Sequence, residues 1–213
     1  MSTPTLELRN LEVAYTVRGI DREVLRSISL SIEPGEAYGL VGESGCGKST
    51  AAYAAMRYLP RNGKITGGSI LFEGRDMVTM SDGEVGELRN SVISMVYQNP
   101  VAALNPTIRV GDQVAEVFEL AGKSKAEAGK LALEALVRVK IADPEKVMRR
   151  YAHQLSGGMR QRVMIAMALS CNPSILIADE PTTALDVTIQ AQILKLMNDL
   201  KASRNTAILF ITH

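Results

Sequence analysis

The sequence lacks an excess of either charge, a disulfide framework and any long hydrophobic run. Its 24 Lys and Arg residues against 23 Asp and Glu residues leave a formal net charge of +1, so no global field attracts nucleic acid or an anionic membrane. The two cysteines, Cys46 and Cys171, are too few to form a disulfide framework for 213 residues and indicate reduced thiols. No stretch approaches the roughly 20 apolar residues that span a bilayer, and no secretory leader precedes the first strand pattern. These absences predict a soluble intracellular chain in which a local site holds any anionic ligand.

The composition that is present is that of a globular protein, with 46% hydrophobic and 22% charged residues. It excludes a disordered tail, a collagen-like fibre and a disulfide-rich secreted module. The length allows one large domain or two small ones.

Alternating hydrophobic residues at the N-terminus predict β-structure. Leu6 and Leu8 alternate with polar residues, and the alternation resumes one residue out of phase after Asn10. A third alternating run, 28–32, stops at Pro34-Gly35. This pattern favours a half-buried antiparallel sheet.

The pattern then changes to short apolar strands separated by helices. Strands are predicted at 38–41, 91–97, 174–179 and 207–212, and helices at 50–58, 189–200 and over most of 107–171. Short strands that are apolar throughout indicate a parallel sheet covered on both faces. The long helical stretch between β elements is predicted to be a subdomain.

A glycine-rich loop after the strand at 38–41 fits the pattern G-x-x-x-x-G-K-[ST]. Such glycines let backbone N–H groups surround phosphate oxygens, Lys48 can reach the β- and γ-phosphates, and the Ser49 hydroxyl can ligate Mg²⁺. The following helix adds the positive end of its dipole. The alternative is a glycine-rich turn with no ligand. The predicted ATP-binding residues are Gly42, Glu43, Ser44, Gly45, Cys46, Gly47, Lys48, Ser49 and Thr50.

Two acidic residues follow the apolar strand 174–179. Asp179 stands at the carboxyl end of that strand, where α/β sheets place their ligands, and its carboxylate can hold Mg²⁺. Glu180 is then positioned to act as a general base for an attacking water. The alternative is that both acids simply end a strand in solvent.

Ser156, Gly157 and Gly158 precede a long apolar helix and form an N-cap arrangement, which is a second anion site at a helix terminus. One nucleotide does not need two such sites, whereas two chains facing head to tail do, because each lends its second site to the other's nucleotide. A flexible helix start is the alternative.

Together these motifs resemble the nucleotide-binding subunit of an ATP-binding cassette transporter, and most closely the oligopeptide, dipeptide and nickel importers. The resemblance covers nearly the whole chain and follows the family's order: the phosphate loop, Gln98-Asn99-Pro100, LSGGM at 155–159, ILIADE at 175–180, Ala184-Leu185-Asp186 and Ile211-Thr212-His213. It implies an α/β fold, a P-loop NTPase cassette with a mainly parallel core sheet, an antiparallel N-terminal β-subdomain and an inserted helical subdomain at about 99–171. It also implies ATP and Mg²⁺ as ligands.

The resemblance implies roles for further residues. Gln98 corresponds to a glutamine that contacts Mg²⁺, beside Ser49 and Asp179, and senses the membrane subunit. Asp186 corresponds to an aspartate that crosses the dimer interface, although alone it equally suits a helix N-cap. Tyr15 corresponds to the aromatic residue that stacks on adenine, although a tyrosine on a strand is also ordinary packing. His213 corresponds to a contact of the γ-phosphate, which makes Glu180, Gln98 and His213 the expected catalytic set.

The implied function is ATP hydrolysis that powers import of peptides, or of a small solute such as nickel, at the cytoplasmic face of the membrane. The implied partners are a second ATPase subunit of identical or related sequence, transmembrane permease subunits and, indirectly, an extracytoplasmic substrate-binding protein, with no nucleic acid. Family members continue past the histidine at which this sequence stops, so residues 1–213 are expected to be a cassette incomplete at its C-terminus.

Two other hypotheses remain. One is a cassette ATPase that acts in DNA repair or translation, against which stand the compact stretch between Lys48 and Asp179, the single cassette and the absence of a basic composition. The other is a nucleotide-dependent binding module without turnover, which a phosphate-release assay separates from an ATPase.

Overall fold

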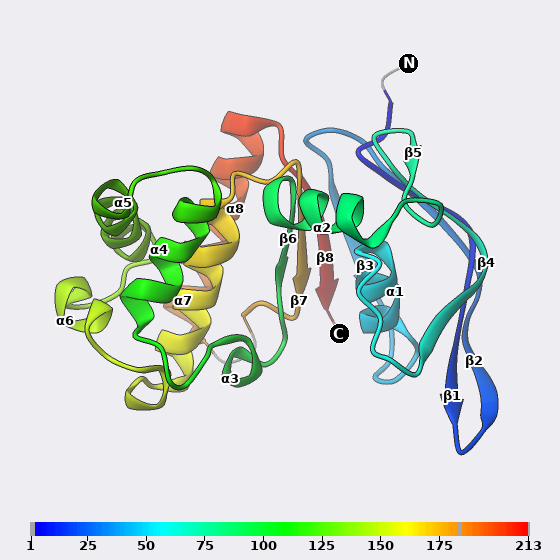
Figure 1. The fold of residues 1–213 in the computed structure, drawn as a ribbon, viewed down its shortest axis with the longest axis horizontal. Helices are drawn as coiled ribbons and strands as arrows, with labels where there is room; N and C mark the ends of the chain where they lie inside the picture. Colours follow the sequence, from blue (N-terminus) through cyan, green and yellow to red (C-terminus); the bar gives the residue numbers. More distant parts are fainter. Residues whose placement is uncertain (1–2, 183–184, 213) are drawn as a thin grey trace.

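Two sheets of different kinds divide the chain in the computed structural model, which describes residues 3–182 and 185–212 (Figure 1). The antiparallel sheet has the order β2-β1-β4-β5, and the parallel sheet has the order β3-β8-β7-β6. The antiparallel strands are β1 (Leu6–Val17), β2 (Ile20–Ile32), β4 (Gly63–Phe72) and β5 (Arg75–Asp76), and the parallel strands are β3 (Ala37–Val41), β6 (Ile93–Val96), β7 (Ile175–Asp179) and β8 (Ala207–Thr212). The predicted pair of an antiparallel N-terminal sheet and a parallel core sheet is confirmed.

The phase change predicted after Asn10 is a β-bulge in β1. Asn10 has a φ of 47°, and the pairing register with β2 shifts between Leu8 and Leu11. Gly68 on β4 has a φ of 79°, and a Cβ there would collide with the backbone oxygen of Asn10. The bulge lets Leu8 and Leu11 both face the core although they are three residues apart.

Strands β6, β7 and most of β8 are buried on both faces, which explains why they lack polar alternation, whereas the edge strand β3 leaves Ala37, Gly39 and Val41 exposed. Along β7, Ile175 and Ile177 belong to one hydrophobic core, whereas Leu176 and Ala178 belong to another. The first core is shared with the antiparallel sheet and the second with the helical layer. The parallel sheet therefore separates the two cores. Elements that pack in either core can reach the edge at which its strands end.

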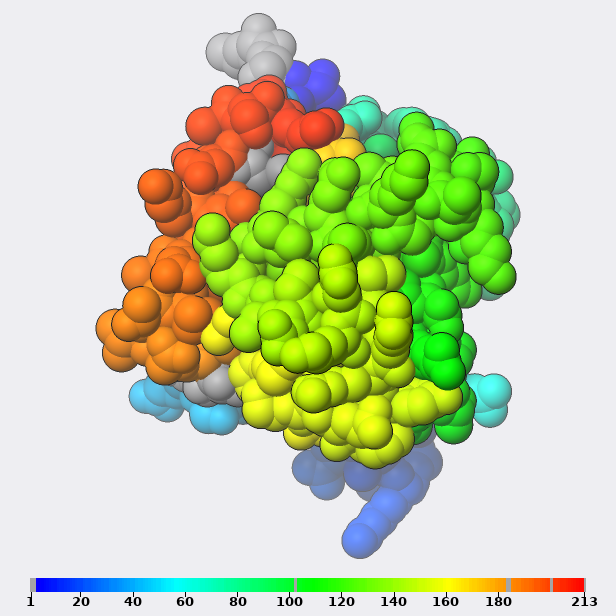
Figure 2. All heavy atoms as spheres, turned by 90° about the vertical axis from the view of Figure 1, so that its left-hand side faces the viewer, coloured from blue at the N-terminus to red at the C-terminus, as the bar shows by residue number. Residues whose placement is uncertain are grey.

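The helices are α1 (Lys48–Ala55), α2 (Asp82–Ser91), α3 (Pro100–Ala103), α4 (Val110–Leu120), α5 (Lys125–Arg138), α6 (Pro144–Met148), α7 (Gly157–Ser170) and α8 (Val187–Arg204), with a 3₁₀ turn at Ala152–Gln154. Helix α1 lies between the two sheets, and α3 to α7 lie on the opposite side of the parallel sheet (Figure 1). Figure 2 views the helical side, where α5 to α7 cover the centre of the molecule. Within the described residues, no helix combines the length and apolarity needed to cross a membrane.

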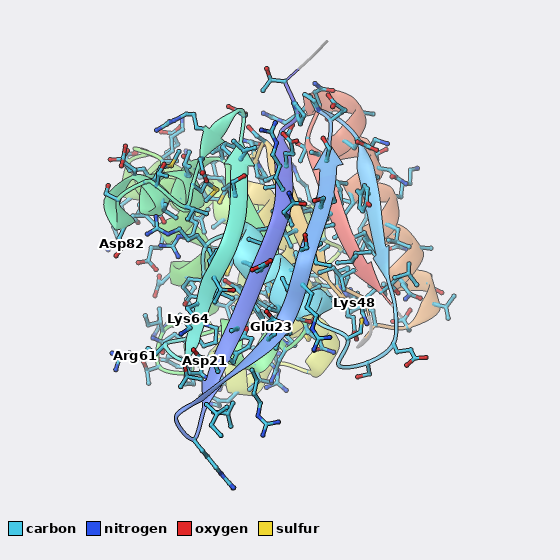
Figure 3. The ribbon with its side chains drawn as sticks, turned by 90° about the vertical axis from the view of Figure 1, so that its right-hand side faces the viewer. Asp21, Glu23, Lys48, Arg61, Lys64 and Asp82 are labelled. Atoms are coloured by element: carbon cyan, nitrogen blue, oxygen red, sulfur yellow. The ribbon has the colours of Figure 1, made fainter. Side chains whose placement is uncertain are left out.

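Periodicity alone misses three elements between Tyr58 and Ser91, namely β4, β5 and α2. Helix α2 begins with a capping box, in which the Ser81 hydroxyl accepts from the backbone N–H of Glu84 and the Glu84 carboxylate accepts from that of Ser81. Figure 3 looks onto the antiparallel sheet, where Lys64 on β4 pairs with Asp21 on β2 at 2.5 Å.

Candidate nucleotide-binding site

The predicted phosphate loop connects β3 to α1, and two of its glycines have backbone conformations that other residues adopt with strain. Gly45 has a φ of 79° and Gly47 a φ of 103°. A Cβ at Gly47 would lie 3.0 Å from Leu25 Cδ2 on β2, so the loop is also packed closely against the antiparallel sheet. No side chain caps the start of α1. The cradle at this helix start is therefore made of backbone.

Lys48 places its ammonium group inside this loop. Its side chain is almost buried, with 7% of the residue exposed, and Nζ donates to the backbone oxygens of Gly42 at 2.6 Å and Glu43 at 2.7 Å. Figure 3 shows Lys48 beside β2, at the edge of the antiparallel sheet. A positive charge and the start of a helix thus occupy one small region, which is the electrostatic requirement for holding a phosphate group.

Asp179 ends β7 at the same edge of the parallel sheet, 1% exposed. Strand β8 lies between β7 and β3, pairing Asp179 with Ile211 and Thr212 with Val41, the residue before the loop. Burial, and after it the Asp179 carboxylate, raise the pKa of Tyr53 on α1. The Asp179 carboxylate is therefore near enough to α1 to act on Tyr53.

Glu180 and Gln98 lie 82 residues apart in sequence, and the fold joins them: Gln98 Nε2 donates to Glu180 Oε2 at 2.9 Å. The backbone of Glu180 has a φ of 46°, a conformation that costs energy for a residue with a side chain, and its N–H donates to the Ile211 oxygen at 3.1 Å. The strained backbone turns the chain after β7, and the Gln98 amide fixes one carboxylate oxygen. Two of the predicted catalytic residues are therefore in contact.

The oxygen donors at this edge suit Mg²⁺ better than a transition metal. The predicted ligands offer a hydroxyl at Ser49, an amide at Gln98 and a carboxylate at Asp179, whereas no cluster of three His, Cys, Asp or Glu side chains occurs among residues 3–182 and 185–212. Mg²⁺ is commonly held by one or two carboxylates together with substrate phosphates, not by an all-protein cage. The donor set therefore fits a metal that arrives with a nucleotide.

The second predicted anion site lies on the other side of the parallel sheet. Ser156 caps α7, its hydroxyl accepting from the Met159 N–H at 3.3 Å, and both Ser156 and Gly157 are exposed. A Cβ on Gly157 would meet nothing within 4 Å. Helix α7 packs in the helical core, whereas α1 packs in the core shared with the antiparallel sheet. One chain thus holds its two helix-start sites in separate layers.

The remaining predicted residues have local roles in the fold. Tyr15 is half-buried, and its ring packs over Gly63, where a Cβ would come within 2.8 Å of Tyr15 Cε1. Asp186 caps α8, its carboxylate accepting from the Ile189 N–H at 3.0 Å. Tyr15 thus packs on its strand and Asp186 caps a helix, as the alternative interpretations of these two residues predict. His213 lies outside the described residues.

Sequence reasoning gave no role to two glutamines that hold the loop after Glu180. Gln161 Nε2 on α7 donates to the Pro181 oxygen at 2.6 Å, and Gln190 Nε2 on α8 donates to Thr182 Oγ1 at 2.8 Å. A polar residue among the apolar positions of α7 was the available signal for Gln161. Its acceptor is a backbone oxygen, and the residue pattern does not indicate which backbone oxygen a side chain will contact.

Comparison with known proteins gives one family and a consistent set of relatives. The model of the ABC transporter family matches residues 25–183. The chain is 50% identical over 209 residues to the oligopeptide transport ATP-binding protein OppD of Salmonella typhimurium and 48% identical over 210 residues to the dipeptide transport ATP-binding protein DppD of Bacillus subtilis, with 98% of this chain covered in each case. It spans 62% and 63% of the lengths of those two relatives.

Solved structures agree on the fold. The ATP-binding cassette MJ0796, in a dimer bound to ADP and Pi, superposes with a TM-score of 0.88 at 29% identity, covering 98% of this chain and 88% of that one. The CbiO1 protein of Clostridium perfringens, part of the ABC transporter complex CbiONQ, superposes with a TM-score of 0.78 and covers 100% of this chain and 79% of its own.

Proposed function

Because the chain belongs to the ABC transporter family, we propose that it binds and hydrolyses ATP to power the import of peptides. The observation that carries the enzymatic part is the hydrogen bond between Gln98 and Glu180, at the sheet edge where β7 delivers Asp179. The peptide part is supported by the relatives OppD, an oligopeptide transport ATP-binding protein, and DppD, a dipeptide transport ATP-binding protein.

In the proposed reaction, the phosphate loop binds the triphosphate. Residues 42–47 supply backbone donors, and the Lys48 ammonium exchanges its bonds with the Gly42 and Glu43 oxygens for bonds to the β- and γ-phosphates. This exchange costs little, because the ammonium is already dehydrated and held at the start of α1. Tyr15, on the neighbouring strand β1, is proposed to contact adenine.

Ser49, Gln98 and Asp179 are the residues proposed to hold Mg²⁺ together with the nucleotide. A metal held by these residues would supply positive charge that stabilises the phosphate group during hydrolysis. Asp179 contributes the carboxylate of this set, because β7 brings it to the sheet edge next to the phosphate loop.

Glu180 is proposed to accept the proton of the attacking water. Gln98 donates to Oε2, which orients the carboxylate for this role. His213 is proposed to contact the γ-phosphate, by family resemblance alone. The strained backbone at Glu180 is consistent with a side chain whose direction matters more than local stability.

A second cassette, identical or related, is the proposed partner for Ser156, Gly157, Gly158 and Asp186. In one chain, α7 starts in a different layer from the phosphate loop, so its exposed start is available to a nucleotide held by another chain. The similar cassette MJ0796 is a dimer in its solved structures, which supports a second cassette as the partner.

Residues of about 99–171, which include α3 to α7, are proposed as the inserted helical subdomain. We propose further that Gln98, at the junction of this segment and the core sheet, responds to transmembrane permease subunits at the cytoplasmic face of the membrane. An extracytoplasmic binding protein would then act only through those subunits.

Calorimetric titration with MgATP tests the proposed function. Wild-type protein and Lys64→Ala, which loses only the surface pair with Asp21, should bind equally, whereas Lys48→Ala should not bind measurably. A phosphate-release assay on the same samples separates an ATPase from a binding module. Equal ATP affinity in all three proteins would refute the assignment of the phosphate loop.

A further inference from the structure

Gln161 on the second turn of α7 makes a buried contact with the loop after Glu180. It is 1% exposed, and its Nε2 donates to the Pro181 oxygen at 2.6 Å. Only five positions separate it from Ser156, which caps the same helix. One rigid helix turn thus connects the exposed start of α7 to the residue that follows Glu180.

The other end of the Gln161 amide has no hydrogen-bond partner among the described residues, since Oε1 is buried without one. Burying a polar atom in this way is unfavourable, and an apolar side chain of similar shape would avoid the cost. Stability alone therefore does not explain a glutamine here. What the glutamine adds is its single donor bond to the Pro181 oxygen.

The loop that receives this bond is held from three elements. Glu180 is fixed by β8 through the Ile211 oxygen, Pro181 by α7 through Gln161, and Thr182 by α8 through Gln190. The Pro181 oxygen belongs to the peptide unit between Pro181 and Thr182, one residue beyond Glu180, so a displacement of α7 is transmitted through Pro181 to the backbone of Glu180. The carboxylate would then change its position relative to Gln98.

We propose that Gln161 is a positioning residue that couples Ser156 to Glu180 within one chain. The proposal rests on the proposed function, in which Ser156 contacts the nucleotide of a second cassette. When that contact forms, α7 shifts and pulls Pro181 through Gln161, which brings Glu180 into its catalytic position. Each chain thereby detects its partner's ATP before it hydrolyses its own.

Gln161→Met keeps the shape of the side chain and removes the donor. We expect the melting temperature to stay within about 4 °C of wild type, because one unpaired polar atom, Gln161 Oε1, is exchanged for another, the Pro181 oxygen. ATP affinity should stay within about twofold, whereas the turnover number should fall about 10- to 100-fold, the usual cost of misplacing a reacting group.

Gln190→Met is the matched control, because it removes the same kind of donor from the same loop but from α8. It should retain the wild-type turnover number within about threefold. Equal losses in the two variants would overturn the proposal, since both amides would then only hold the loop in place. A wild-type turnover number in Gln161→Met would also overturn it.

Hydrogen exchange tests the coupling without any change at Gln161, should that variant fail to fold. An isotope-labelled Lys48→Ala chain, whose own phosphate loop is disabled, is mixed with wild-type chain and MgATP. The amides of Glu180 and Thr182 in the labelled chain should exchange more slowly, and a further Ser156→Arg change in that chain should abolish the effect. Unchanged exchange in the mixed dimer would overturn the coupling. Wild-type protein that fails to bind ATP would instead refute the proposed function, and the coupling with it.

Discussion

Helices α1 and α7 both begin at a predicted phosphate contact, yet their first turns are built in opposite ways. Helix α1 follows a strained glycine, Gly47, has no side-chain cap, and carries an almost buried lysine bonded to its own loop. Helix α7 follows Ser156, which caps it, and begins with the exposed Gly157, where an added Cβ would meet no other atom. The first site is closed within one chain, and the second offers a surface to another molecule. We infer that the first binds ATP by itself and the second acts only across an interface.

Glu180→Gln should have the largest effect and should locate the chemistry at the α1 site. The variant keeps the shape of the side chain and should retain ATP, while turnover falls about 10²- to 10⁴-fold, the usual contribution of a positioned base. Phosphate release together with ATP titration measures both quantities. Asp179→Asn is the control, and it should weaken the dependence on Mg²⁺ instead. Identical behaviour of the two variants would contradict the separate roles.

Lys48→Ala and Ser156→Arg should differ in their effects on ATP affinity. Lys48→Ala removes the charged donor to phosphate and should leave no measurable ATP binding, whereas Ser156→Arg should leave the affinity of the isolated chain unchanged. Equilibrium titration with a fluorescent ATP analogue gives both values. If Ser156→Arg lowers the monomer's affinity as much as Lys48→Ala does, the two helix starts share one site.

Gly47→Ala and Gly157→Ala compare the same substitution at the two helix starts. At Gly47 the φ of 103° and the close approach of Leu25 should cost about 1–3 kcal/mol of unfolding free energy. At Gly157 the added methyl group meets open space, and the change should be less than about 1 kcal/mol in either direction. Urea denaturation measures both, and equal costs would mean that the glycines at α1 are not required by backbone geometry.

Ser156→Ala and Ser124→Ala should give the smallest effects, and they separate capping from ligand contact. Ser124 caps α5 as Ser156 caps α7, each hydroxyl accepting at 3.3 Å from the N–H three residues on. Each variant should lose about 1 kcal/mol of unfolding free energy. Only Ser156→Ala should also reduce turnover in the dimer. A matching loss of turnover in Ser124→Ala would reduce the role of Ser156 to that of a cap.

The parallel core was predictable because burial on both faces leaves strands that are apolar throughout, as in β7 and β8. Strand β4 was not, since Gly63, Gly67 and Gly68 interrupt its alternation and Gly68 serves the bulge opposite Asn10. Helix α2 was missed although its capping box is legible in the residues from Ser81 to Glu84.

The contacts of the candidate site also divide into those that the sequence predicts and those that it does not. Motifs with fixed spacing gave the phosphate loop and the Asp179-Glu180 pair, because local chain geometry sets their positions. The bond between Gln98 and Glu180 joins distant segments, and only family resemblance suggested a role for Gln98. The contact from Gln161 to the Pro181 oxygen was not predictable, since a backbone acceptor has the same chemistry at every residue.

Sedimentation velocity with a fluorescent ATP analogue distinguishes a helix start that binds its own chain's ATP from one that acts across an interface, because one run reports bound nucleotide and mass together. In the Glu180→Gln background, which prevents turnover, the nucleotide should sediment with a dimer. With Ser156→Arg added, the same amount of nucleotide should sediment with a monomer. If the added Ser156→Arg change removes the nucleotide from the protein, or leaves the dimer intact, α7 does not act across an interface and the account is wrong.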